Sequence, residues 1–196
     1  MEHSMTPRLI ARTVAVLTTT LAITIAGARD EDALAAGQIL TTTTKVSGSS
    51  IPRVTIRGVV DAPPARIWAI VGDCDTYVAR LPRIRASRVV ERTDHGMICE
   101  LTVALPFPLS DLTAKTRAVH VEGPPRWDRR WTLVKGDYEI NDGSWVLEVF
   151  QGDPNRTLVT YSVHAVPHSA VPPWARRRAQ ESSMPGLIER LREETR

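Results

Sequence analysis

The chain has 196 residues, 42% of them hydrophobic, and a formal net charge of +3. This length and apolar content fit one medium-sized domain with its own core and extra sequence at the N-terminus. The small positive excess attracts anionic surfaces only weakly, so the charge does not identify a membrane as a partner, and no nucleic-acid partner is expected.

The first 35 residues have the pattern of an export signal. Arg8 and Arg12 precede an uncharged run from Val14 to Ala28. That run is about 15 residues long, whereas a membrane-spanning helix needs about 20. Residues 1–35 are therefore predicted to be a signal peptide, and its removal would leave the protein in the periplasm or outside the cell. An uncleaved anchor is the alternative.

Two small-x-small patterns are candidate cleavage sites. Ala26-Gly27-Ala28 directly follows the apolar run, and Ala33-Leu34-Ala35 lies a few residues later. The next segment, residues 36–50, is rich in Thr, Ser and Gly, which predicts a flexible linker or a loose first strand. The folded domain is then expected to cover residues 51–196.

The domain is predicted to open with a strand and two short helices. Side chains alternate from Arg53 to Val60, as in a half-buried strand. Pro63 and Pro64 then suit the first turn of a helix that ends at Gly72. Asp73 or Asp75 can cap a second short helix.

From Ile84 onward the apolar pattern has a period of two, which predicts six consecutive antiparallel strands. Turn-forming residues separate them, including Asp94-His95-Gly96, Asn141-Asp142-Gly143 and Asp153-Pro154-Asn155. The predicted strands are 85–93, 97–105, 112–122, 127–136, 143–151 and 157–166.

The last segment, from Pro172 to Arg192, is predicted to be one long amphipathic helix that Pro185 kinks. An antiparallel sheet with such a helix on one face is an α+β arrangement. A strongly twisted sheet can curl around the helix and leave a tunnel between the two, and an apolar tunnel suits an apolar ligand.

Five stretches in this order resemble bacterial single-domain members of the START-like (SRPBCC) superfamily, in particular coenzyme Q-binding and polyketide cyclase-type domains. The sequence departs from the family pattern at Leu112-Thr113, where members often have an Arg-Asp pair. The five stretches are Val60–Trp68 (VDAPPARIW), Leu105–Asp111 (LPFPLSD), Asn141–Glu148 (NDGSWVLE), Arg156–Tyr161 (RTLVTY), and Pro172–Trp174 together with Met184–Leu187.

The resemblance implies a helix-grip fold, in which a curved seven-stranded antiparallel sheet wraps around a long C-terminal helix. It also implies an apolar pocket under that helix. The implied function is non-enzymatic binding or transport of a lipid, sterol or quinone-like molecule, without a cofactor. Large apolar side chains on the expected concave face and on the helix either line this pocket or fill it. The expected lining residues are Trp131, Leu133, Trp145, Leu147, Val159, Tyr161, Val163, Trp174, Met184, Leu187, Ile188 and Leu191.

The sequence contains no recognisable catalytic or metal-binding motif: no HExxH, GxSxG, GxGxxG or Walker pattern occurs. A polyketide cyclase or aromatase on the same fold is the alternative, and it needs an acid–base group inside the pocket. The candidates are Glu100, Glu148, His120, His164 and Tyr161. An interaction domain with a filled core is the third possibility.

Two further features remain open at this stage. Arg176, Arg177 and Arg178 are either a solvated helix flank or a patch for transient contact with anionic lipid head groups at the pocket mouth. Cys74 and Cys99 either pair in an oxidising compartment or are two small buried apolar side chains. The protein is expected to be a monomer.

Overall fold

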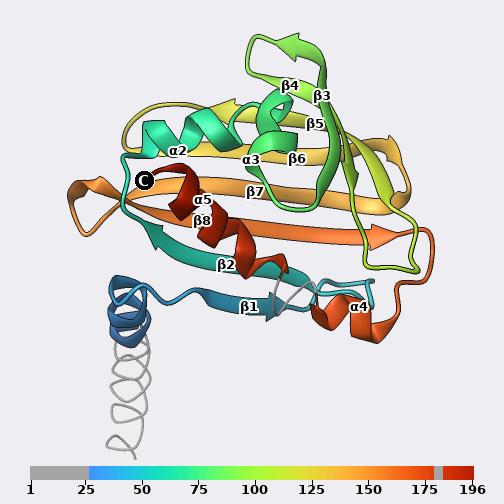
Figure 1. Ribbon diagram of the computed structural model, residues 1–196, viewed down its shortest axis with the longest axis horizontal. Coiled ribbons are helices and arrows are strands. Elements are labelled where there is room, and N and C mark those ends of the chain that lie inside the picture. Colours follow the sequence, from blue (N-terminus) through green and yellow to red (C-terminus); the bar gives the residue numbers. More distant parts are fainter. Residues whose placement is uncertain (1–26, 179–182) are drawn as a thin grey trace, which may run out of the picture.

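The computed structural model describes residues 27–178 and 183–196, and nearly half of these residues belong to one eight-stranded antiparallel sheet (Figure 1). The spatial order of the strands is β1-β2-β8-β7-β6-β5-β4-β3, so only β2 and β8 are neighbours without being consecutive in the chain. The strands are β1 (Leu40–Thr44), β2 (Arg53–Val60), β3 (Ile84–Thr93), β4 (Gly96–Val103), β5 (Leu112–Val121), β6 (Arg126–Gly136), β7 (Tyr138–Phe150) and β8 (Asp153–Pro167).

The helices are short, and three of them lie over the same face of the sheet. Figure 1 shows α5 crossing this face with α2 and α3 beside it, while α4 lies beyond the end of β8. Residues 27–35 form a further helix before β1. The later helical elements are α2 (Pro64–Val71), the 3₁₀ turn η1 (Cys74–Thr76), α3 (Tyr77–Arg80), α4 (Pro173–Arg178) and α5 (Pro185–Glu194).

The first strand and the helices after it follow from local sequence signals. The prediction of a strand from Arg53 to Val60 is confirmed as β2. Helix α2 begins with Pro64 in its first turn, where the missing N–H costs nothing. The Asp73 side chain accepts a hydrogen bond from the backbone N–H of Asp75, so it caps the 3₁₀ turn η1 that leads into α3, whereas α3 itself has Thr76 at its N-cap and no side-chain cap.

The sheet has one strand more than the seven predicted. The additional strand is β1, which lies in the segment 36–50 that was predicted to be a linker or a loose first strand. Its threonines favour extended backbone, and they pair with β2 from Leu40 opposite Arg57 to Thr44 opposite Arg53. An edge strand with exposed polar side chains needs no apolar alternation, so the pattern that revealed the other strands is absent here.

The described residues do not show the expected long C-terminal helix from Pro172 to Arg192 as one element. Two short helices, α4 and α5, stand in its place, and residues 179–182 between them lie outside the described residues. Pro185 was predicted to kink a helix from within, but it occupies the first turn of α5 instead. A proline fits there because that turn has no partner for its N–H.

Two predicted turns lie inside strands. Asn141-Asp142-Gly143 belongs to β7, and Asp153-Pro154-Asn155 belongs to the start of β8. The chain reverses instead near Gly136, with φ +144°, and at Gln151 and Gly152, with φ +50° and +78°. Two consecutive residues with positive φ match the twist of the strands that they join.

The core forms where α5 packs against the centre of the sheet. Ile188 and Leu191 on α5 have no exposed surface, and neither do Leu147 and Val159 beneath them. Gly58 on β2 permits the close approach, since a Cβ there would lie 2.7 Å from Cγ2 of Ile188. This packing seals the sheet at one end of α5 and leaves the region near its first turn open.

Candidate functional site

A cavity of about 320 Å³ lies beside the first turn of α5, and strands β3 to β8, α3, α4 and the loop after β4 contribute to its wall. Its volume is at the lower end of the range of about 300–1,000 Å³ that is usual for small-molecule sites. Most of the lining side chains are apolar, among them Leu81, Leu101, Val103 and Leu105.

The residues predicted to line a pocket divide into two groups. Six of the twelve surround this cavity: Trp131, Trp145, Tyr161, Val163, Met184 and Leu187. They come from β6, β7, β8, the start of α5 and the residue before it, so segments far apart in the sequence meet here.

The other six do not contact the cavity. Leu147, Val159, Ile188 and Leu191 are fully buried and fill the core under α5. Leu133 packs in a smaller cluster with Leu112 and Tyr138, and Trp174 on α4 is 42% exposed. The alternatives of lined and filled interior are therefore both realised, at opposite ends of α5.

Three aromatic rings form one wall of the cavity. Tyr161 packs against Trp145, with ring centroids 4.4 Å apart, and stacks on Trp131 at 5.8 Å. Nε1 of Trp131 donates a hydrogen bond to Oδ1 of Asn141 at 3.0 Å, which fixes the indole. Gly143 makes room for this ring, because a Cβ there would lie 2.4 Å from Cζ2 of Trp131.

Arg129 lines the cavity from β6, and the sequence analysis did not identify it. It is only 2% exposed. Its Nη1 donates to the carbonyl of Gly72 at 2.9 Å and contacts Nε2 of His120 at 2.7 Å, while its Nη2 donates to Sγ of Cys99 at 3.2 Å. The guanidinium carbon also lies 5.8 Å from the centre of the Tyr77 ring. The alternation Trp127-Arg129-Trp131 is the signal that could have placed this arginine on the inner face.

His120 on β5 supports the arginine and must be neutral to do so. An arginine can only donate, so Nε2 of His120 is the acceptor and the ring proton sits on Nδ1, 3.6 Å from Glu122. Burial lowers the pKa of His120, and the nearby charge of Arg129 lowers it further. Trp68 packs edge-on against the ring at 5.2 Å.

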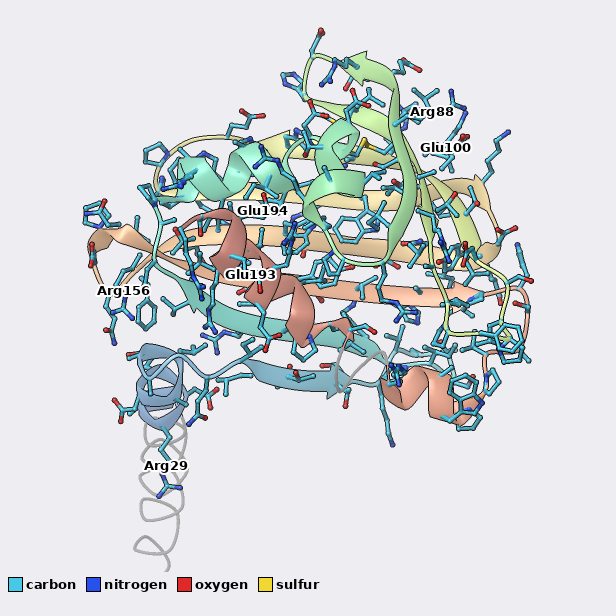
Figure 2. The ribbon with its side chains drawn as sticks, in the orientation of Figure 1. Arg29, Arg88, Glu100, Arg156, Glu193 and Glu194 are labelled. Atoms are coloured by element: carbon cyan, nitrogen blue, oxygen red, sulfur yellow. A yellow bond between two sulfur atoms is a disulfide. The ribbon has the colours of Figure 1, made fainter. Side chains whose placement is uncertain are left out.

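The five candidate acid–base residues are not brought together. Glu100 pairs with Arg88, and Figure 2 shows both on the outer side of β3 and β4, away from α5. Glu148 pairs with Arg126, and His164 is buried against Ser49 and Ile51. Tyr161 alone among the five lines the cavity, while His120 reaches it only through Arg129. Burial raises the pKa of Tyr161 far above its ordinary value, so its hydroxyl stays protonated.

Cys74 and Cys99 form a disulfide that joins η1 to β4 behind the cavity. The structure therefore contradicts the alternative in which Cys74 and Cys99 are two unpaired apolar side chains. The bond encloses a 25-residue separation that includes α3 and β3. It fixes α3, whose Tyr77 contributes to the cavity wall.

The loop after β4 and helix α4 both border the cavity and carry exposed side chains next to it, so we take this side as its mouth. Pro106 and Ala175 line it from these two segments, and their neighbours Phe107 and Trp174 are 94% and 42% exposed. Arg178, at the end of α4, is exposed as well. Of the predicted basic patch, the side chains of Arg176 and Arg177 lie outside the description.

Residues 27–178 and 183–196 contain neither a cluster of metal ligands nor a helix that could span a membrane. No group of three or more His, Cys, Asp or Glu side chains there could hold a metal ion. None of the helices in this part of the chain is long and apolar enough to cross a membrane.

Comparisons with known proteins agree on the fold. The chain is similar to a STAR-related lipid transfer protein from Xanthomonas axonopodis, with 21% identity, a TM-score of 0.68, and coverage of 80% of this chain and 93% of that one. A START superfamily protein from Mycobacterium smegmatis is 19% identical, with a TM-score of 0.60 and coverage of 73% and 96%. The Zhui aromatase/cyclase from Streptomyces sp. R1128 is 18% identical, with a TM-score of 0.51 and coverage of 72% and 87%. No curated protein sequence matches the chain.

These similarities, at 18% to 21% identity, establish a START-like fold and nothing finer. A family model gives the assignment: the one described as polyketide cyclase / dehydrase and lipid transport matches residues 60–192. That range includes the cavity, the disulfide and most of the sheet. The chain therefore belongs to the polyketide cyclase/dehydrase and lipid transport family, and its fold is START-like.

Proposed function

We propose that this protein binds a hydrophobic small molecule, such as a lipid, sterol or quinone-like compound, in the cavity beside α5 and carries it without chemical change. The observation that carries the proposal is a cavity of about 320 Å³ whose wall is mostly apolar and includes three large aromatic rings. Moving an apolar ligand from water into such a space is favourable by about 25 cal/mol per Å² of apolar surface buried.

The cyclase alternative has less support from the geometry. General acid–base catalysis needs a group that changes protonation near neutral pH. Among the candidates only Tyr161 lines the cavity, and its raised pKa makes it a poor base. A binding role requires none of this, because shape and apolar surface suffice.

We further propose that the protein works in the periplasm or outside the cell. The leader in residues 1–35 supports this, and so does the Cys74–Cys99 disulfide, since such bonds persist mainly in oxidising compartments. Transient membrane contact at the cavity mouth fits the same role. Aromatic side chains favour the membrane interface and basic ones are attracted to anionic lipids, and the mouth carries Phe107, Trp174 and Arg178.

The proposal is tested by identifying what co-purifies with the mature domain. Native mass spectrometry should show an apolar small molecule that is released on unfolding, and stripped protein should take up an environment-sensitive apolar fluorophore in a saturable manner. Leu101→Arg, which places a charge on the cavity wall, should abolish uptake, whereas the exposed Val134→Arg should not. Protein that is always empty and takes up no probe would refute a carrier role.

The membrane contact has its own test. The Phe107→Ser, Trp174→Ser double variant should co-sediment less with anionic vesicles than the wild type does, while it still binds the fluorophore. Val78 and Val119 are exposed apolar side chains outside the cavity wall and the loops at its mouth, so a Val78→Ser, Val119→Ser variant is the matched control. Equal sedimentation of all three proteins would exclude Phe107 and Trp174 as the contact.

A further inference from the structure

The positive charge of Arg129 is buried with no carboxylate in contact with the guanidinium. Asp73 is near enough to interact electrostatically with Arg129, but its side chain pairs with Arg92. Arg129 takes part in none of the ion pairs among the described residues, and the three groups that its side-chain nitrogens contact are all neutral. The adjacent Asp128 faces the other side of the sheet, where it pairs with Arg126 and Arg130. Burying a guanidinium without an anion is costly, and an anion that reached it would recover part of that cost.

Arg129 also has hydrogen-bonding capacity left over. A guanidinium carries five N–H donors, and three contacts account for both donors of Nη1 and one of Nη2. Nε and the second N–H of Nη2 have no acceptor among the described residues. These two nitrogens share one edge of the guanidinium plane, and when the contact with Cys99 uses the N–H of Nη2 on the other edge, the two remaining donors match the two oxygens of a carboxylate.

The arginine lies at the closed end of the cavity. Its neighbours there are Tyr77 and Trp145, each at most 5% exposed, whereas Pro106 and Met184 at the open end are partly exposed. A ligand that entered from the mouth would therefore reach Arg129 with its leading end. The aromatic wall of Trp131, Trp145 and Tyr161 would contact the rest of it.

We propose that the ligand is an apolar carboxylic acid whose ionised head group binds Arg129 at the closed end while its apolar body lies along the aromatic wall. This inference rests on the proposed binding function and narrows it to a chemical class. The small volume favours a single chain or a compact ring system over a lipid with two long chains.

The competing explanation is that Arg129 only braces the fold. Its bond to Gly72 ties the end of α2 to the sheet, and the partial negative charge at a helix C-terminus offsets some of the positive charge. A brace predicts no preference for an acidic ligand, so the two explanations differ in a measurable way.

The experiment compares ligands that differ only in the head group. Stripped wild-type protein is titrated with dodecanoate and with 1-dodecanol, each displacing an environment-sensitive apolar fluorophore, at about pH 8 and about 0.15 M salt, where the acid is ionised. The dissociation constant for dodecanoate should be lower than that for 1-dodecanol by a factor of about ten or more. The reason is that hydrogen bonds to charged groups are stronger than those between neutral groups. This comparison needs no variant, so it decides the question even if Arg129 is required for folding.

Variants then locate the preference. Arg129→Gln should bind the acid and the alcohol equally well and keep the wild-type affinity for the alcohol. Arg130→Gln is the matched control. The guanidinium of Arg130 is next to Arg129 in the chain but exposed on the opposite face of the sheet, so the preference for the acid should persist.

Three results would overturn the inference. Equal affinity of the wild type for both ligands would refute the preference for an acidic head group, but it would not contradict the proposed binding function. A preference for acid that survives Arg129→Gln would show that another group binds the carboxylate. If the protein binds neither of the two ligands nor the fluorophore, the proposed binding function and this inference are both refuted.

Discussion

Among single residues, His120 has the environment most sensitive to pH. It accepts a hydrogen bond from Arg129, packs against Trp68, and lies 3.6 Å from Glu122. Burial and the charge of Arg129 lower its pKa from 6.5, while Glu122 and the more distant Asp73 oppose the shift. A protonated ring could no longer accept from Arg129 and would place two positive charges side by side.

The lowered pKa makes stability depend on pH in a definite direction. The unfolded chain binds a proton at His120 near pH 6.5 and the folded chain only at lower pH, so this residue contributes stability above pH 6.5 that is lost as pH falls through that window. Urea unfolding at about pH 7.5 and about pH 5 measures how much unfolding free energy is lost as the pH falls. This loss should be smaller in His120→Gln than in the wild type. His168→Gln, a change at an exposed loop histidine, should behave as the wild type. An unchanged pH dependence in His120→Gln would contradict the assignment.

At the level of elements, the disulfide holds η1 and α3 against the sheet. Cross-linking a loop of this length removes conformational freedom from the unfolded chain, and the Cys74→Ser, Cys99→Ser double variant should lose about 3 kcal/mol of unfolding free energy. Denaturant unfolding of the variant, and of the wild type with and without a reductant, checks this. Reduced wild type should resemble the variant. A variant as stable as the oxidised wild type would show that the bond is not formed in solution.

Gly143 couples three neighbouring strands of the sheet. An added Cβ would lie 2.3 Å from the carbonyl oxygen of Ser162 on β8 and 2.4 Å from the Trp131 ring on β6. Gly143→Ala should therefore destabilise the protein by about 1–3 kcal/mol and weaken binding of the apolar fluorophore, since the indole must move toward the cavity. Gly186→Ala in α5 is the control, because a Cβ there meets nothing within 4 Å and stability should hold. Wild-type stability and binding in Gly143→Ala would refute this role.

The same glycine shows where sequence reasoning reaches its limit. Alternation located six of the seven strands after residue 50 to within a few residues, since alternation follows directly from a sheet with one buried face. The Asn-Asp-Gly run before Ser144 has the composition of a turn, and its glycine serves instead to make room for an indole that lies 12 residues earlier in the chain. Such a requirement appears only when the strands are side by side.

The candidate site also has one part that the sequence pattern predicts and another that it does not. Its aromatic wall follows from inward-facing positions on neighbouring strands, which the sequence does reveal. Arg129 does not follow, because a strand arginine usually points to solvent and only the assembled sheet shows this one against Gly72 and His120. Whether Ile188 and Leu191 line or fill the interior depends on how closely α5 approaches Gly58, and this distance is set by tertiary packing.

For the molecule as a whole, the helix at residues 27–35 is part of the folded domain. Leu34 in this helix has no exposed surface and packs with Val59 and Phe150, which lie on β2 and β7. The backbone carbonyl of Gly37 directly after it accepts a hydrogen bond from Arg192 of α5 at 3.1 Å. Burying a leucine side chain contributes about 1.5–3 kcal/mol, so losing this helix would weaken the edge of the sheet.

This packing distinguishes the two cleavage patterns of the proposed leader. Cleavage after Ala35 would remove Leu34, whereas cleavage after Ala28 would keep residues 29–35 of the helix, including Leu34, and place Arg29 at the new N-terminus. We expect the exported protein to begin at Arg29, which the intact mass of material from the periplasm or medium would show. Leu34→Ala should lower the unfolding free energy of that mature protein by about 2–5 kcal/mol, and the exposed Ala36→Ser should not. A mature chain that begins at Ala36 and is as stable as one that begins at Arg29 would mean that the helix contributes nothing to the domain.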